Sequence, residues 1–206
     1  KSTFCLQWFF WLAQEKNIPC LFFCLDMGLD RIIEMLVAHV LKANREHVTL
    51  QEVTAAASYF HQVPMHICTY SKTLTIESVA EQIELAAARY GVEAVCFDHL
   101  HVLCRGSDNY FGEVSRVSAS FKQLAQETKV AMVVIHQPKK LEDEREPDLY
   151  SASGSSLIPA DCDAMASLYR RRVKGTEEDE EGSQTLDNKV KVSVLKSRYT
   201  SGGFTH

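Results

Sequence analysis

The sequence predicts an α/β fold: a mainly parallel, twisted sheet flanked by helices, with a C-terminal hairpin. Three observations lead to this fold class. Apolar runs of strand length alternate with segments of helical periodicity along most of the chain. The runs are nearly continuous in apolar residues, as expected of buried parallel strands. Near the C-terminus, two further strand-like runs enclose an acidic stretch, residues 175–187, which predicts a solvated hairpin loop.

The individual elements follow from these patterns. Residues 2–16 predict a helix that ends before Asn17 and Pro19, and its apolar residues lie on more than one face, so we expect it to be largely buried. Thr75 is the predicted N-cap of a later helix that stops at Gly91. The predicted helices are 2–16, 29–42, 50–60, 78–90 and 113–128, and the predicted strands are 20–26, 65–70, 93–98, 130–136, 164–169 and 190–195.

Length and composition set the broad class of protein. The 206 residues, 46% of them hydrophobic, show neither repeats nor a boundary, so we expect a single domain over residues 1–206. Because the net charge is -5, nucleic acid would have to bind a local basic strip. Seven cysteines without a C-x-x-C pair indicate a reduced compartment. No apolar run approaches the roughly 18 residues of a membrane span, and residues 4–13 lack the cleavage site of a secretion signal.

The first three residues are typical of the end of a phosphate-binding loop. Lys1, Ser2 and Thr3 directly precede the first predicted helix. In such a loop the helix N-terminus holds the phosphates, the Lys reaches the outer phosphates and the hydroxyl binds Mg²⁺. An ordinary Ser N-cap is the alternative. Since the glycine-rich half is absent, we expect a fragment cut within its nucleotide site and again at its C-terminus, and inactive as it stands.

Two carboxylates at the ends of predicted strands strengthen the nucleotide hypothesis. Asp98 ends an apolar strand in the form of a Walker B element, where a carboxylate can orient Mg²⁺. Asp26 ends the strand after the first helix and could activate a water for attack on a γ-phosphate. The alternatives are a turn-capping Asp and a helix-initiating Asp. An apolar strand ending in Asp about a hundred residues after a Lys-Ser helix start favours the nucleotide site.

Other polar residues also follow predicted strands. Gln137 could sense the γ-phosphate, or it could be an ordinary residue at the start of a loop. Lys196 and Arg198 share one face of the last strand and could reach a phosphate on a neighbouring subunit. The alternative is that they protect a sheet edge. His99 and His101 lack the further ligands of a transition-metal site, so we expect His99 to pack or hydrogen-bond beside the nucleotide site.

The order of these motifs resembles the motor domain of hexameric replicative helicases of the DnaB type. The resemblance extends from Lys1 to about Gly202, and its polar connection and ending look most like phage-type helicase-primases and the mitochondrial helicase Twinkle. It implies a RecA-like P-loop NTPase core, an ATP-hydrolysing DNA helicase, and ATP and Mg²⁺ as cofactors. The segments that carry it are KSTF, LFFCLDM, VCFDHLHVL, EVSRVSASFKQLAQETKVAMVVIHQ, DLYSASGSSLIPADCDA and VLKSRYTSG.

The resemblance implies a role for each matching residue. Asp26 matches the catalytic carboxylate, which is usually Glu in the family, so the attacking water would lie about one methylene further away. The polar stretch 137–156 matches a central-channel loop that grips single-stranded DNA, although it also carries several acids. The matches are Lys1, Ser2, Thr3 and Asp98 for ATP, Ser2 and Asp98 for Mg²⁺, Asp26, Gln137, Lys196 and Arg198 for catalysis, and Lys139, Lys140 and Arg145 for DNA.

The resemblance also implies partners and a location. The partners are single-stranded DNA, further copies of the chain in a hexameric ring, and a primase domain or protein; no membrane is involved. The expected location is the cytoplasm or nucleoid of a bacterial or phage system, with the mitochondrion as the alternative and secretion excluded.

Two other functions fit the same residues. The first is another RecA-superfamily ATPase, such as a recombinase or a clock-type ring ATPase, and filament formation rather than unwinding would identify it. The second is a nucleotide-dependent scaffold that does not hydrolyse ATP, which the replacement of Glu by Asp26 favours. DNA-stimulated hydrolysis would exclude the scaffold.

Overall fold

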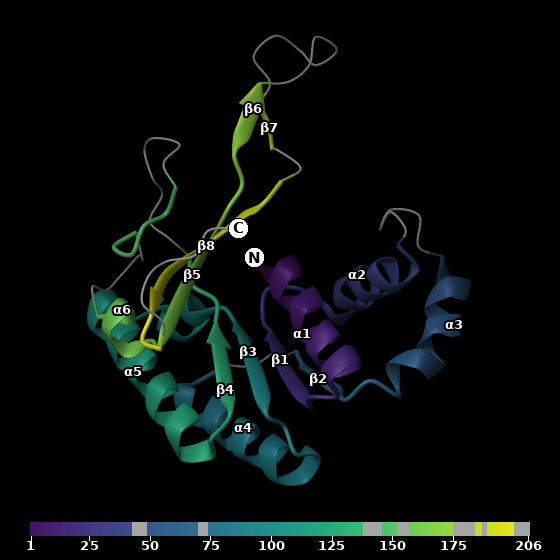
Figure 1. Ribbon diagram of the computed structural model, residues 1–206. Coiled ribbons are helices and arrows are strands. Elements are labelled where there is room, and N and C mark those ends of the chain that lie inside the picture. Colours follow the sequence, from purple (N-terminus) through teal and green to yellow (C-terminus); the bar gives the residue numbers. More distant parts are fainter. Residues whose placement is uncertain are drawn as a thin grey trace. The chain divides into compact units, whose positions relative to one another are not determined.

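The computed structural model describes residues 1–42, 49–69, 74–137, 146–151, 157–174, 184–186 and 189–199 (Figure 1). The contacts group the chain into two compact units, Lys1–His136 and Gln137–His206, and each unit is described by itself. The expectation of a single domain over residues 1–206 stays a prediction.

The first unit is built on a four-stranded sheet whose strands are all parallel. These strands are β1 (Cys20–Cys24), β2 (Met65–Cys68), β3 (Ala94–Asp98) and β4 (Ala131–Val134). In the order β2-β1-β3-β4, the central strands β1 and β3 are buried along their whole length, whereas β2 and β4 are only partly buried. The buried apolar runs therefore form the centre of a parallel sheet, which confirms the predicted fold class.

Helices cover both faces of this sheet (Figure 1). They are α1 (Ser2–Lys16), α2 (Leu29–Leu41) and α3 (Leu50–Phe60) on one face, α4 (Ile76–Tyr90) and α5 (Tyr110–Thr128) on the other, and the short 3₁₀-helix η2 (Leu100–Cys104) after β3. Alternating side chains of the strands fill the two layers. The ring of Phe22 packs against Phe9 of α1, with 6.0 Å between centroids, and the ring of Phe97 packs against Phe121 of α5, at 4.9 Å.

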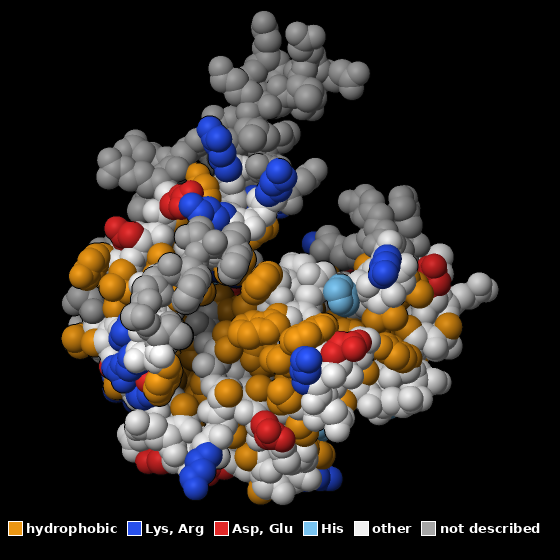
Figure 2. Space-filling model, in the orientation of Figure 1, with side chains coloured by type: hydrophobic (Ala, Val, Ile, Leu, Met, Phe, Trp, Pro, Cys, Tyr) orange, Lys and Arg blue, Asp and Glu red, His pale blue; other side chains and the backbone are white. Residues whose placement is uncertain are grey.

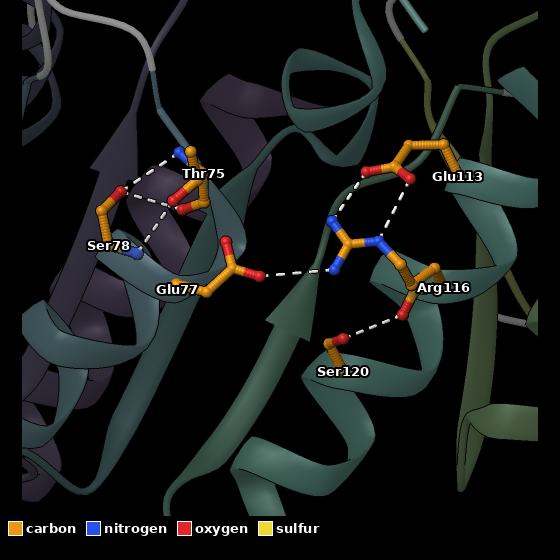
Figure 3. A network of polar contacts seen from close by, with 6 residues as sticks. All are labelled: Thr75, Glu77, Ser78, Glu113, Arg116 and Ser120. Atoms are coloured by element: carbon orange, nitrogen blue, oxygen red, sulfur yellow. Dashed lines mark hydrogen bonds and ion pairs between the residues drawn. The ribbon is translucent and has the colours of Figure 1, made fainter. Parts of the chain in front are cut away.

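Local signals explain where the helices begin and end. The hydroxyl of Thr75 accepts a hydrogen bond from the backbone N–H of Ser78, as the predicted N-cap should, and Gly91 ends α4 in the left-handed conformation. Figure 3 shows how α4 and α5 are joined on their shared face. Arg116 of α5 pairs with Glu113, at 2.7 Å, and with Glu77 of α4, at 3.4 Å.

The structure corrects one expectation about α1. The helix was predicted to be largely buried because it is apolar all round, but only one side of it packs on the sheet. The exposed residues Phe4, Trp8 and Trp11 follow one another at helical spacing on the other side. Figure 2 shows hydrophobic side chains gathered over this helix. When apolar residues occur all around a helix, the sequence does not show which side will pack on the sheet. In α1 the tertiary packing determines which residues are buried.

The second unit contains the predicted hairpin. Its elements are α6 (Ile158–Asp161), β5 (Ala164–Tyr169), β6 (Arg172–Lys174), β7 (Gln184–Leu186) and β8 (Lys191–Ser197). β5 pairs with β8 and β6 with β7, both antiparallel. The stretch 175–187 was predicted to be loop throughout, but β7 lies within it. Three residues are too few to show the alternating pattern of a strand in the sequence. β7 forms because its backbone pairs with that of β6.

Smaller differences concern strand ends. β1 ends at Cys24 rather than at residue 26, and β4 spans four residues rather than seven. β3 ends at Asp98 as predicted, and the 3₁₀-helix η2, which was not predicted, follows it. Among the described residues, no helix has the length and the apolar run that crossing a bilayer requires.

Candidate nucleotide-binding site

The candidate residues of the first unit meet at the carboxyl edge of its sheet. Nζ of Lys1, at the start of α1, donates a hydrogen bond of 3.1 Å to the carbonyl oxygen of His136, just beyond β4. The backbone N–H of Leu25, just beyond β1, donates to the carbonyl oxygen of Asp98 at 3.3 Å. The ends of three parallel strands and the start of α1 are thereby tied together, where α/β sheets usually bind ligands.

Lys1 and Asp98 form the charged centre of this edge. Asp98 ends β3 and is only 4% exposed, so its carboxylate needs a compensating partner. Partial burial lowers the pKa of the Lys1 ammonium, and the negative charge of Asp98 acts in the opposite direction on that pKa. The edge therefore carries a cation, which could meet a phosphate, and a carboxylate, which could meet a divalent cation.

The first turn of α1 differs in charge from those of the other long helices, each of which carries an acid in its first turn. Side chains of Thr49, Thr75 and Asn109 cap α3, α4 and α5, whereas α2 begins after Gly28 without a side-chain cap. Among the described residues, no side chain caps α1 by a hydrogen bond, and its first turn contains no acid. The N-terminal N–H groups and the positive end of the helix dipole are thus available to an anion.

Apolar packing brings the first turn of α1 close to the strand that carries Asp98. Cys5 of α1 and Cys96 of β3 are both buried in the same hydrophobic core cluster. Burial raises the pKa of the Cys96 thiol. Because Cys96 lies two residues before Asp98 on the same strand, this packing helps to hold the start of α1 near the end of β3.

Asp26 lies in a bend beyond β1, and both of its carboxylate oxygens have a partner. Nδ1 of His99 is 2.9 Å from Oδ2, and Nη2 of Arg105 donates to Oδ1 at 3.2 Å. A carboxylate accepts hydrogen bonds, so Nδ1 of His99 is the donor in this contact. The expectation that His99 hydrogen-bonds beside the candidate site agrees with this contact.

Histidine rings line the edge next to these groups. The ring centroid of His101 lies 5.7 Å from that of His99 and 4.5 Å from that of His136, both edge-on. Tyr110, at the start of α5, also packs against His101, with 5.9 Å between ring centroids. The cluster packs His101 of η2 against His136, two residues after β4, and so stabilises the loop after Asp98.

Lys196 and Arg198 lie in the second unit, where both bind the segment around α6. Nζ of Lys196 donates to the carbonyl oxygens of Pro159 and Cys162, the latter at 2.8 Å. Arg198 donates through Nη1 to Asp163 at 3.2 Å and through Nη2 to the carbonyl oxygen of Ala160 at 2.5 Å. Lys196 near the end of β8 and Arg198 just beyond it thus contact the same segment, and their action on a neighbouring subunit stays a prediction.

The remaining predicted residues fall in two groups. Gln137 is exposed and directly follows His136, but it belongs to the second unit. The three candidate DNA contacts, Lys139, Lys140 and Arg145, lie outside the described residues. The structure thus brings Lys1, Ser2, Asp26 and Asp98 together at one edge of the first unit. Lys196 and Arg198 lie together in the second unit, which is described by itself.

Sequence reasoning missed two features of the edge. The carbonyl oxygen of His136 accepts a hydrogen bond from Lys1. Every residue has a backbone carbonyl, so the amino-acid sequence does not show which one will bind the lysine. Arg105 binds Asp26 from seven residues beyond Asp98, a spacing that matches no motif. Only the turn of the chain through η2 brings Arg105 back to the site.

Comparisons with known proteins identify the family. Residues 1–205 match the model of the DnaB-like helicase C-terminal domain. The replicative DNA helicase DnaB of Leifsonia xyli subsp. xyli (strain CTCB07) is 25% identical over 183 residues, which are 82% of this chain and 40% of that protein. The DnaB of Nostoc sp. (strain PCC 7120 / SAG 25.82 / UTEX 2576) is 26% identical over 147 residues, 66% of this chain and 17% of that protein.

A solved structure supports the fold. A DnaB-like replicative helicase, described together with its interactions with primase, matches with a TM-score of 0.77 at 17% identity, over 100% of this chain and 52% of that chain. The chain therefore spans about half or less of the length of these relatives. Because the family model matches nearly the entire sequence, the chain belongs to the family of DnaB-like helicase C-terminal domains.

Proposed function

We propose that this chain is the motor domain of a replicative DNA helicase, which couples ATP hydrolysis between subunits of a ring to movement along single-stranded DNA. Membership of the DnaB-like family supports this function. The observation that carries it is the meeting of Lys1, Asp26 and Asp98 at the carboxyl edge of a parallel sheet.

The residues at this edge fit ATP and Mg²⁺. The uncapped, acid-free first turn of α1 suits phosphate groups, and Lys1 adds a positive charge to it. The Ser2 hydroxyl and the Asp98 carboxylate are the hard oxygen ligands that Mg²⁺ prefers. Among the described residues no group of three or more His, Cys, Asp or Glu could hold a metal, which suits an ion bound largely through phosphates and water. When bound, Mg²⁺ neutralises charge on the phosphates.

Asp26 is the residue that takes the proton of the attacking water. It is the only one of the two edge carboxylates that is substantially exposed, with 44% of its side chain accessible, whereas Asp98 is buried. An accessible carboxylate can approach a water, and a buried one beside a lysine is better suited to a cation. Gln137, just beyond the end of β4, senses the γ-phosphate.

Lys196 and Arg198 act on the ATP of a neighbouring subunit. Head-to-tail contacts generate a ring when their rotation closes, and they place the end of β8 of one subunit at the nucleotide of the next. A cation supplied in this way stabilises charge in the transition state of phosphoryl transfer. Lys139, Lys140 and Arg145 would bind the DNA backbone in the channel without reading its sequence, so binding should weaken with salt. A primase domain or protein is a further proposed partner.

The ATPase rate of the full-length protein, with and without single-stranded DNA, tests this function. We expect stimulation by DNA, its loss in Arg198→Ala, and partial recovery when Arg198→Ala is mixed with Asp26→Asn, because each variant then supplies what the other lacks. Arg170→Ala, which removes an exposed arginine that directly follows β5, is the matched control and should hydrolyse ATP at the wild-type rate.

Other outcomes identify the alternatives. A rate that is independent of both DNA and Arg198 would leave a RecA-like ATPase and contradict the helicase. Filaments on DNA without unwinding of a forked duplex would indicate a recombinase-like ATPase. ATP-dependent assembly without phosphate release would indicate the non-hydrolysing scaffold.

A further inference from the structure

Asp26 is held on both sides although it belongs to no regular element. It lies in the bend between β1 and α2, where the backbone alone does little to fix a side chain. One carboxylate oxygen meets Nδ1 of His99 at 2.9 Å, and the other accepts from Nη2 of Arg105 at 3.2 Å. An Asp side chain has only two rotatable torsions, so two donors on opposite oxygens fix its orientation.

Both donors come from one short segment. His99 is the N-cap residue of η2 and Arg105 is its C-cap residue, so the carboxylate is held from the two ends of one 3₁₀-helix. The same segment begins directly after Asp98, whose carbonyl oxygen accepts from the N–H of Leu25. Asp26 is thus positioned relative to Asp98 by one backbone and two side-chain contacts.

The two donors, His99 and Arg105, differ in burial and in their contacts with other residues. His99 is buried and packs edge-on against His101, so its ring has little freedom to move. Arg105 is exposed over 66% of its side chain, and Asp26 is the partner that its guanidinium binds. An exposed ion pair of this kind contributes little to folding, since solvent screens it and two side chains lose freedom. Its effect should therefore be on the direction of the carboxylate rather than on stability.

The orientation matters because the carboxylate is short. An Asp carboxylate reaches about one methylene less far from the backbone than the carboxylate of the Glu that the resemblance to DnaB-type helicases implies here. Because the Asp side chain is shorter, its carboxylate can reach the attacking water from fewer positions. The rate of hydrolysis therefore depends more on the direction in which the carboxylate is held.

We propose that Arg105 is a positioning residue, which together with His99 holds the Asp26 carboxylate in the direction from which it takes the proton of the attacking water. This inference rests on the proposed function, because it requires that Asp26 act in ATP hydrolysis. Arg105 itself contacts neither the water nor the nucleotide; it acts through Asp26.

The test compares three variants of the full-length protein. Arg105→Ala should lower kcat for DNA-stimulated hydrolysis roughly 10- to 100-fold, the cost of misplacing a reacting group, while KM for ATP stays within about twofold because phosphate binding is untouched. Arg105→Lys should recover part of kcat, since an ammonium keeps the charge but lacks the planar fork. Arg116→Ala, which removes the partly exposed ion pairs with Glu113 of α5 and Glu77 of α4, should leave both constants unchanged.

A double-mutant cycle separates positioning from a general structural effect. In an Asp26→Ala background, Arg105→Ala should cause no further loss of the residual rate, because no carboxylate is left to orient. Independent, multiplying losses would overturn the proposal, as would an unchanged or raised kcat in Arg105→Ala.

The outcome for the wild type distinguishes the two levels of inference. DNA-stimulated hydrolysis in the wild type with normal activity in Arg105→Ala would overturn the positioning role and leave the helicase function standing. A wild type that binds ATP but never hydrolyses it would overturn both.

Discussion

Arg198 is bound by Asp163 of its own chain through both backbone and side chain. The N–H of Arg198 donates to the carbonyl oxygen of Asp163 at 2.8 Å, and Nη1 lies 3.2 Å from the Asp163 carboxylate. A guanidinium has five N–H donors, so an arginine held in this way can still donate to a phosphate. Asp163 therefore orients the Arg198 guanidinium and still leaves it N–H groups that can donate to a phosphate.

This contact leads to a prediction for Asp163→Ala. Loss of the carboxylate should lower the DNA-stimulated ATPase rate several-fold, and less than Arg198→Ala does, because the cation remains but is less well held. Both side chains are partly exposed, so the free energy of unfolding should change by less than about 1 kcal/mol. Steady-state rates and urea unfolding of the same preparations would measure both effects. Equal losses in the two variants would contradict a purely orienting role.

The packing of β1 on α1 should dominate the stability of the first unit. Phe22 has no exposed surface and packs edge-on against Phe9. Phe22→Ala would leave a cavity in this layer, and we expect a loss of about 3–5 kcal/mol in the free energy of unfolding. Phe111→Ala, at a position that is 63% exposed, should change it by less than about 0.5 kcal/mol. Similar values for both variants in denaturant unfolding would contradict this core.

The ion pairs of Arg116 predict how stability depends on pH. The hydrogen bond from Arg116 lowers the pKa of the Glu113 carboxyl in the folded state, so the pair stabilises the fold above the unfolded-state pKa of about 4.3. This contribution is lost as the pH falls through the folded-state pKa. Arg116→Ala should therefore lower Tm by about 1–3 °C at pH 7, and by less at pH 3. A difference in Tm that stays constant from pH 7 to pH 3 would contradict this origin.

Most elements of the fold could be predicted because their signals are local. Helix α1 has the predicted bounds, and the N-cap and stop of α4 lie at Thr75 and Gly91 as expected. These depend on residues a few positions apart, which the sequence displays directly. The ends of β1 and β4 could not be predicted to the residue, since pairing with neighbouring strands decides where a strand stops.

The candidate site could be predicted only in part, for the same reason. A carboxylate after an apolar strand and a Lys-Ser pair before a helix are local patterns, and they led to Asp26, Asp98, Lys1 and Ser2. The partners of Asp26 were not predictable. Arg105 is 79 residues away from it in sequence and reaches it only because parallel strands β1 and β3 are neighbours and η2 turns the chain back.

The sequence by itself therefore determined the long helices and parallel strands of the first unit, their order and the carboxylate that ends β3, because periodicity and caps depend on residues a few positions apart. The short elements η2, α6, β6 and β7 were not predicted. The tertiary structure alone decided which side of α1 packs, that Lys1 binds the carbonyl oxygen of His136, and that His99 and Arg105 hold Asp26. Each of these contacts joins segments that are distant in the chain, and their meeting follows from strand order and packing rather than from residue type.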